Sequence, residues 1–205
     1  MIRPFGESGL LVETGDAHRA QALAIAVRGA MPDAVAVVPG LESLLVELDA
    51  STDLEGAARR LEQLAAGAAA AARAGRVITI PVRYGGTGGP DLADVAETCG
   101  LSEAEVIELH LGSELRVLFL GFAPGFAYLG GLDEGLRVPR LATPRTRTPA
   151  GSVAIADSMT GIYPADLPGG WRIIGHTDLV MFNPHRDPPA LLAPGDRVRF
   201  ERVGS

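Results

Sequence analysis

The chain has 205 residues, a formal net charge of −7 and an apolar content of 47%, which suits one large or two small globular domains. All 18 basic residues are arginine, which excludes chemistry that needs a lysine: a P-loop, a Schiff base or an attached biotin. The acidic balance argues against nucleic acid as a partner, no apolar run is long enough for a membrane span, and a lone cysteine with no signal-peptide pattern predicts a cytoplasmic protein.

The first part of the chain predicts a small domain with two helices on one face of a four-stranded sheet. Apolar residues recur at helical spacing after Asp16 and again after Asp53. The resulting order of elements is β-α-β-β-α-β, the ferredoxin-like pattern, and we place this first domain at residues 1–82. Its strands are expected at 10–13, 34–38, 43–48 and 77–82.

A glycine-rich loop, YGGTGGP, follows at residues 84–90. It has two interpretations, a phosphate cradle or a linker, and the absence of lysine and of GxxxxGK[ST] favours the linker. Residues 91–110 then predict two short helices, the second with a capping box from Ser102 to Glu105. Their spacing resembles a helix-turn-helix, but the second helix is acidic and has no arginine, so it would repel phosphate. We therefore expect a structural helix pair.

The remainder of the chain predicts a closed or nearly closed β-barrel at residues 83–205. Short β-rich runs alternate there with Gly and Pro turns, which is typical of small barrels. The expected strands lie at 115–120, 152–156, 161–163, 171–174, 179–182 and 197–203.

The segment 116–175 combines dense Gly and Pro with large apolar residues, which indicates ordered loops rather than a disordered linker. Arg137, Arg140, Arg145 and Arg147 lie in it, with no acidic residue between 135 and 156. Arginine forks match carboxylates and phosphates, so these residues form either an anion site or a solvated surface.

Phe119, Phe122, Phe126 and Tyr128 surround the Pro124-Gly125 turn of the same segment. They are either plain core or a partly exposed patch that docks a partner, because aromatics are enriched in interface hot spots. Since the turn interrupts strand alternation, we expect Phe126 or Tyr128 to be exposed in the monomer.

Five motifs in this part of the chain occur in a fixed order: GFAPGFAYLGGLD, ATPRTRTPAGSVAIA, TGIYP, PGGW and PPALLAPGDRVRF. In these motifs the chain resembles the family of 5-oxoprolinase B subunits, whose members are also labelled allophanate hydrolase subunit 1, carboxyltransferase subdomain C/D and kinase inhibitor KipI. We therefore expect an α+β chain in which the ferredoxin-like domain is followed by a barrel that, as the resemblance implies, is cyclophilin-like. The resemblance also implies a complex with homologues of the A and C subunits that opens 5-oxo-L-proline to L-glutamate. The complex, rather than this chain alone, is expected to hold the ATP and Mg²⁺. The chain alone is expected to be inactive.

This chemistry needs cations for phosphate and carboxylate and a shielded pocket. Met159 and His176 replace a Gln and an Arg of the family pattern. If those positions touch substrate, the departures imply either another preferred substrate or a weak enzyme. No metal site is expected. The candidates are Arg145, Arg147 and Tyr163 as catalytic residues, Thr143, Ser152 and His176 as substrate-binding residues, and Phe122, Pro124, Gly125, Phe126 and Tyr128 as the partner interface.

Three other functions stay open at this point. The chain contains no HExxH, CxxC or GxSxG, which leaves room for a binding module. KipI-type relatives inhibit a sensor histidine kinase, and other relatives belong to urea carboxylase or allophanate hydrolase systems. A peptidyl-prolyl isomerase would rest on barrel analogy alone, and a fold does not carry a function.

Overall fold

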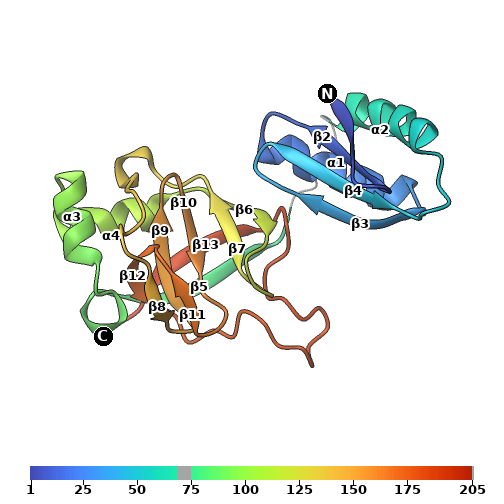
Figure 1. Cartoon of the computed structure of the whole chain (residues 1–205). Coiled ribbons are helices and arrows are strands. Elements are labelled where there is room, and N and C mark those ends of the chain that lie inside the picture. Colours follow the sequence, from blue (N-terminus) through green and yellow to red (C-terminus); the bar gives the residue numbers. More distant parts are fainter. Residues whose placement is uncertain (69–74, 205) are drawn as a thin grey trace. The chain divides into compact units, whose positions relative to one another are not determined.

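The computed structural model describes residues 1–68 and 75–204 and divides the chain into two compact units, Met1–Ala74 and Gly75–Ser205 (Figure 1). Within the described residues, no helix has the length and apolar character that crossing a membrane requires.

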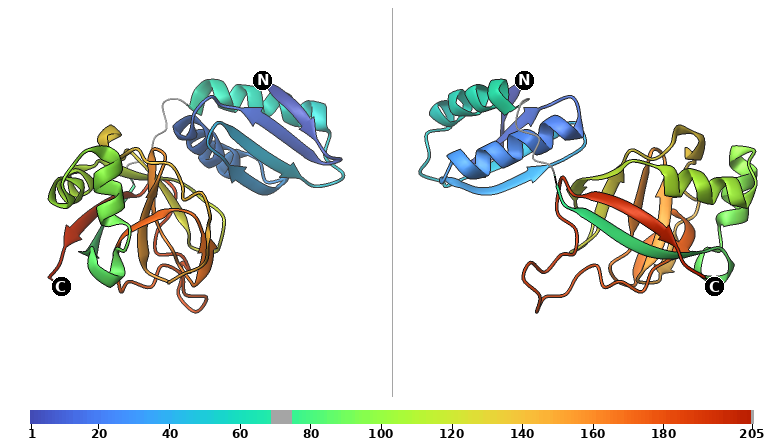
Figure 2. Two further views of the ribbon diagram at one scale, coloured as in Figure 1. Left: turned by 60° about the vertical axis from the view of Figure 1, so that its left-hand side comes forward. Right: turned by 180° about the vertical axis from the view of Figure 1, so that it is seen from behind.

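The N-terminal unit is an antiparallel sheet of order β1-β2-β4-β3 with both of its helices on one face (Figure 2). Residues alternate along the strands, so that Leu10 and Val12 of β2 and Leu44 and Val46 of β4 are buried on the helical face. The Asp16 carboxylate caps the first helix by accepting from the Arg19 N–H at 2.8 Å. The elements are β1 (Ile2–Phe5), β2 (Gly9–Glu13), α1 (Ala17–Ala30), β3 (Ala34–Pro39), β4 (Ser43–Leu48) and α2 (Leu54–Ala68).

The fourth strand of this sheet is not the one that the sequence predicts. Residues 77–82 lie in β5 (Val77–Tyr84), which pairs with β13 (Arg197–Arg202) and β12 (Arg172–His176) in the second unit. The N-terminal sheet is completed instead by β1, which forms a hairpin with β2. The order is therefore ββαββα, and the first unit ends before β5 rather than at residue 82.

The second unit contains the closed barrel that the turn-rich sequence predicts, with strand order β10-β7-β6-β13-β5-β12-β9. Its interior holds β-branched and leucine side chains from every part of the ring, among them Ile80, Val117, Leu129 and Ile155. Two further strands, β8 and β11, pair separately. The remaining strands are β6 (Leu115–Leu120), β7 (Ala127–Gly130), β8 (Arg145–Thr148), β9 (Ser152–Ala156), β10 (Met159–Ile162) and β11 (Leu167–Gly169).

The predicted helix pair is present as α3 (Leu92–Cys99) and α4 (Glu103–Gly112), which pack on the barrel through Val95, Val106 and Ile107. The capping box is formed: the Ser102 hydroxyl accepts from the Glu105 N–H at 3.2 Å, and Glu105 accepts from the Ser102 N–H at 2.8 Å. Two short 3₁₀ helices, η1 (Gly86–Gly88) and η2 (Glu134–Leu136), lie in the connections.

Candidate functional site

An aromatic cluster is centred on Phe126, just before β7. The Phe126 side chain is 2% exposed, and its ring centroid lies 4.9 Å from Tyr128, 5.3 Å from Tyr163 and 5.6 Å from Trp171. All three contacts are edge-on, the arrangement that ring quadrupoles favour. Phe126 is therefore a core residue of the barrel unit, and the cluster is built around it.

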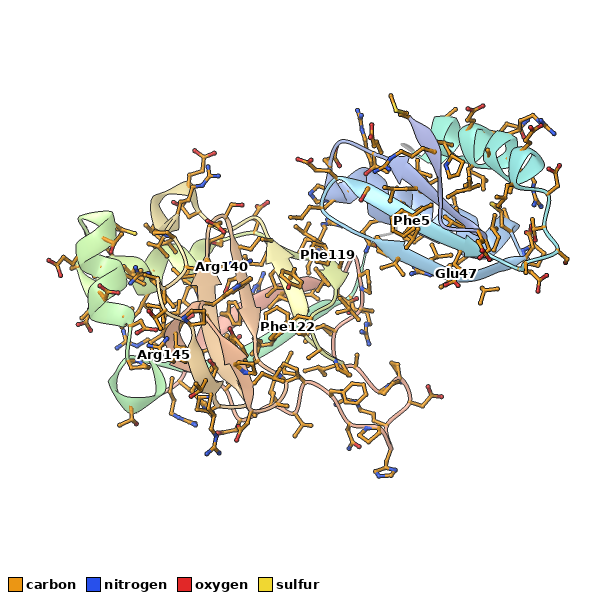
Figure 3. The ribbon with its side chains drawn as sticks, in the orientation of Figure 1. Phe5, Glu47, Phe119, Phe122, Arg140 and Arg145 are labelled. Carbon is orange, nitrogen blue, oxygen red and sulfur yellow. The ribbon has the colours of Figure 1, made fainter. Side chains whose placement is uncertain are left out.

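Phe122, which Figure 3 labels on the barrel unit, packs edge-on against Phe126 and Tyr163 of this cluster. Its ring centroid is 5.4 Å from that of Phe126, yet the residue remains 59% exposed and has a φ of 67°. A bulky residue in the left-handed region costs about 1–3 kcal/mol, which the surrounding turn must over-determine. Gly125 fixes that turn, because a Cβ there would lie 2.6 Å from the Phe182 Cβ.

The expectation that Phe126 or Tyr128 is exposed is wrong. Phe126 is buried and Tyr128 is half-buried, because both rings pack edge-on against Trp171. Gly125 is buried as well, whereas Phe122 and Pro124 are exposed. Of the five predicted interface residues, only these two present an open surface in the chain by itself.

Arg140 is held beside this cluster by the loop that precedes β8. The neighbours of Arg140 in the chain are bonded to the neighbours of Trp171. The Leu141 N–H donates to the Gly170 carbonyl at 2.7 Å, and Arg172 Nε donates to the Pro139 carbonyl at 3.0 Å. Burial raises the pKa of the Tyr128 hydroxyl, and the Arg140 charge opposes that rise. Within the described residues Arg140 forms no ion pair, so its guanidinium group is available to a ligand.

Tyr163, predicted as catalytic, lies in the same place. Burial raises the pKa of its hydroxyl, while the Trp171 backbone and the Arg140 charge act in the opposite direction. Gly169 makes room for the ring, because a Cβ there would collide with the Tyr163 hydroxyl. The charge of Arg140 thus acts on the hydroxyls of both Tyr128 and Tyr163, beside the aromatic cluster.

Arg145 and Arg147, the predicted catalytic cations, are both neutralised by carboxylates. Arg145 Nη2 lies 2.5 Å from Asp91 Oδ1, and Asp91 Oδ2 accepts from the Ile173 N–H at 2.7 Å. Arg147 donates from Nε and Nη2 to Asp166 Oδ2 at 2.9 and 2.5 Å. Neither Asp lies near its partner in sequence, so only the fold reveals these pairs.

The predicted substrate-binding residues divide between two places. Strand register puts His176 opposite Ser152, and His176 Nε2 lies 3.0 Å from the Ala150 carbonyl. Thr143 is exposed on the loop that carries Arg140. Arg83 makes a bidentate pair with Asp178, both distances being 2.7 Å, and its Nη2 lies 3.4 Å from His176 Nδ1. These contacts account for both ring nitrogens of His176.

The glycine-rich loop lines a cavity of about 520 Å³ together with Arg83, Tyr84 and His176. The glycines have a packing explanation: a Cβ at Gly89 would collide with the Ile174 carbonyl oxygen, and one at Gly88 would lie 3.0 Å from the His176 Cβ. The cation beside the loop, Arg83, is already paired with Asp178. These contacts do not fit a phosphate cradle.

A buried polar chain crosses the barrel from Tyr84 and is invisible in the sequence. The Thr160 hydroxyl donates to the Ala154 carbonyl at 3.0 Å, so it must accept from His110 Nε2, also 3.0 Å away. His110 Nδ1 is then free to accept from the Tyr84 hydroxyl at 2.7 Å. No sequence signal marks His110, because a lone helical His has no pattern. Within residues 1–68 and 75–204, no three His, Cys, Asp or Glu side chains gather as metal ligands would.

The fold and motifs agree with comparisons to known proteins. The family described as "Carboxyltransferase domain, subdomain C and D" matches residues 1–192. The chain is 52% identical over 171 residues to the 5-oxoprolinase B subunit of Escherichia coli O157:H7, covering 83% of this chain and 78% of that protein. The Bacillus subtilis 5-oxoprolinase B subunit is 38% identical, covering 98% and 92%.

Solved structures show the same fold. TTHA0988 superimposes with a TM-score of 0.83 at 40% identity over 97% of this chain, which spans 40% of the TTHA0988 chain. Urea carboxylase of Kluyveromyces lactis has a TM-score of 0.77 at 23% identity over 99% of this chain and 22% of its own. The fold is that of a carboxyltransferase C and D subdomain. The chain belongs to this family, and within it to the group of 5-oxoprolinase B subunits.

Proposed function

We propose that the chain is the B subunit of an ATP-dependent 5-oxoprolinase that converts 5-oxo-L-proline to L-glutamate together with the A and C subunits. The observation that carries this proposal is the 52% identity to the E. coli protein named as a 5-oxoprolinase B subunit, over 83% of the chain. The aligned region extends over both units, so the similarity is not limited to the barrel.

In this proposal ATP, with Mg²⁺, supplies the phosphoryl group that makes the lactam carbonyl attackable by water. The glycine-rich loop does not fit its phosphates, because those glycines pack against β12 and Arg83 is paired with Asp178. We therefore assign most of the nucleotide contacts to the partner subunits.

The contribution of this chain is to bind and orient the substrate carboxylate. Among the described residues no carboxylate pairs with the Arg140 guanidinium, and its charge acts on the hydroxyls of Tyr128 and Tyr163. Trp171 and Phe126 pack edge-on against each other and form the apolar side of the proposed site. A charge-assisted hydrogen bond of this kind contributes about 1.5–3 kcal/mol.

Phe122 and Pro124 are the proposed contact with the C subunit. Phe122 is exposed and its backbone is strained, which is typical of a residue kept for an interface. TTHA0988 carries this fold within a chain more than twice as long as the matched part, since the present chain spans 40% of it. That length supports association with further domains.

Reconstitution tests the proposal. The purified chain is expected to show no ATP-dependent glutamate formation from 5-oxoproline until the A and C subunits are added. Arg140→Gln should raise KM for 5-oxoproline by roughly tenfold or more, whereas Arg137→Gln, an exposed and unpaired neighbour, should not. Turnover by the chain alone, or none with all three subunits, would contradict the proposal.

A matched pair of phenylalanines tests the interface. Phe122→Ser should weaken binding to the C subunit at least about thirtyfold, the equivalent of about 2 kcal/mol. Phe5→Ser is the control, because Phe5 is 51% exposed on β1. Loss of the complex in the Phe5 variant alone would place the interface elsewhere.

A further inference from the structure

Three arginines outside the site described above line one polar cavity in the barrel unit. The cavity has a volume of about 560 Å³ and is lined by residues from the first part of β6 and of β13. These two strands lie side by side (Figure 1). Arg116 comes from β6, and Arg197 and Arg199 come from β13. Among the described residues that line the cavity, Glu114 is the only acidic one. Three guanidinium groups against one carboxylate leave two positive charges in excess.

The register of β6 and β13 places two of these arginines side by side. Arg116 and Arg197 are opposite each other on antiparallel β6 and β13, so their side chains share one face of the sheet. Arg199 lies two residues further along β13 and points to that same face. Like charges directly opposite each other destabilise a strand pair. The arrangement therefore opposes folding unless something negative offsets it.

No carboxylate of the described residues forms an ion pair with Arg116, Arg197 or Arg199. Arg76, Arg83, Arg145, Arg147 and Arg172 of the same unit are each paired with an Asp. The side chains of Arg116, Arg197 and Arg199 make no ion pair or hydrogen bond with any described residue. Arg116 is half-buried, which reduces its access to solvent and makes an unpaired charge there more costly.

We propose that this cavity binds a small phosphorylated molecule, with Arg116, Arg197 and Arg199 as its ligands. A phosphate dianion matches the two excess charges and offers three acceptor oxygens to three arginine forks. The cavity volume lies within the range of small-molecule sites, so it has room for more than free phosphate. This site is separate from the aromatic cluster and does not depend on the proposed 5-oxoprolinase function.

Calorimetric titration of the full chain tests the proposal, with inorganic phosphate, pyrophosphate and ADP as probes at low ionic strength. We expect pyrophosphate to bind in a one-to-one ratio, with an affinity that falls as salt is added. Arg197→Gln and Arg199→Gln should each weaken it at least tenfold. Arg202→Gln is the matched control, since Arg202 is an exposed, unpaired arginine of the same strand outside the cavity. Tighter binding of ADP than of pyrophosphate would identify a nucleotide as the source of the phosphate.

Three results would overturn the site. One is the absence of pyrophosphate binding to the wild-type chain at millimolar concentration. Another is an equal loss in the Arg202 variant, which would show general charge attraction. The third is that none of the phosphate probes binds while an acidic peptide does, which would show that the cavity contacts a protein partner instead. Thermal melts guard against misfolding: without phosphate, Arg197→Gln should melt no lower than the wild type, because it removes a like-charged pair.

Discussion

Asp91 is the residue on which the position of Arg145 depends. It is 7% exposed and uses both carboxylate oxygens, one for Arg145 and one for the Ile173 N–H of β12. It thereby ties the start of α3 and the β8 ribbon to the barrel wall. Asp166 also uses both of its oxygens, one for Arg147 and one for the Ala150 N–H at 2.9 Å, but its pair with Arg147 is exposed.

Replacing Asp91 should therefore lower the unfolding free energy more than replacing Asp166, the partner of Arg147. Asp91→Ala leaves the Arg145 charge and a buried backbone N–H without a partner, and we expect a loss of about 1.5–3 kcal/mol in unfolding free energy. Asp166→Ala should cost about 1 kcal/mol or less. Urea denaturation of both variants measures the difference, and equal losses would contradict the structural role of Asp91.

The two phenylalanines of the turn should respond to truncation in opposite ways. Phe126→Ala removes the centre of the aromatic cluster, and we expect a loss of about 3–5 kcal/mol. Phe122→Ala removes a largely exposed ring, so the unfolding free energy should change by less than about 1 kcal/mol. Chemical denaturation again provides the measurement. A stable Phe126 variant would mean that this ring is not core.

At the scale of elements, α4 is joined to the barrel by a buried histidine. His110 stacks on Phe200 of β13 at a centroid distance of 4.6 Å and bonds to Tyr84 and Thr160. Complete burial lowers the pKa of His110 to about 3, so the ring is neutral in the folded protein. The neutral ring is also the form that the hydrogen bonds require, since Nδ1 must accept from Tyr84.

This histidine makes stability depend on pH in a definite direction. Because its folded pKa lies below the unfolded value near 6.5, the unfolded chain binds the proton more strongly between about pH 6.5 and 3. Stability should therefore fall as pH drops through that window, at about 1.4 kcal/mol per pH unit.

The test compares unfolding free energies at pH 7 and pH 5, above the range in which carboxylates titrate. Asp166 and Asp178 have lowered pKa values and contribute only at more acidic pH. His110→Gln retains a polar side chain but cannot titrate, so its stability should be nearly flat over this interval. A wild type that is equally stable at both pH values would contradict the assignment.

At the scale of the whole molecule, the boundary between the two units predicts which fragments fold. β5 closes the barrel between β12 and β13, and it contributes Ile80 and Val82 to the core. A fragment of residues 75–205 should therefore give a cooperative melt. A fragment of residues 83–205 should not, because it lacks most of β5 and leaves unpaired edges on β12 and β13. Cooperative folding of the shorter fragment would restore the boundary at residue 82.

The fold was predictable to the extent that it rests on local pattern. Spacing of apolar residues located α1, α2 and most strands, the Ser102 capping box located α4, and Gly and Pro turns indicated the closed barrel. The sheet to which a strand belongs was not predictable. Residues 77–82 have the same β-rich composition in either unit, and only the long-range pairing with β13 assigns them to the barrel. Residues 179–182 form an isolated bridge from Phe182 to Ala190 instead of a strand.

The sequence by itself determined the family, through motifs long enough to be specific, and the absence of lysine chemistry. The tertiary structure decided which charges are free. Arg140, Arg145 and Arg147 are equivalent in the sequence, but Asp91 and Asp166, distant along the chain, neutralise two of them. Likewise, the register of β6 and β13 alone brings Arg116 opposite Arg197. The physical reason is that electrostatic pairing depends on distances of a few ångströms in space, and these are set by strand register and chain crossings rather than by neighbours in sequence.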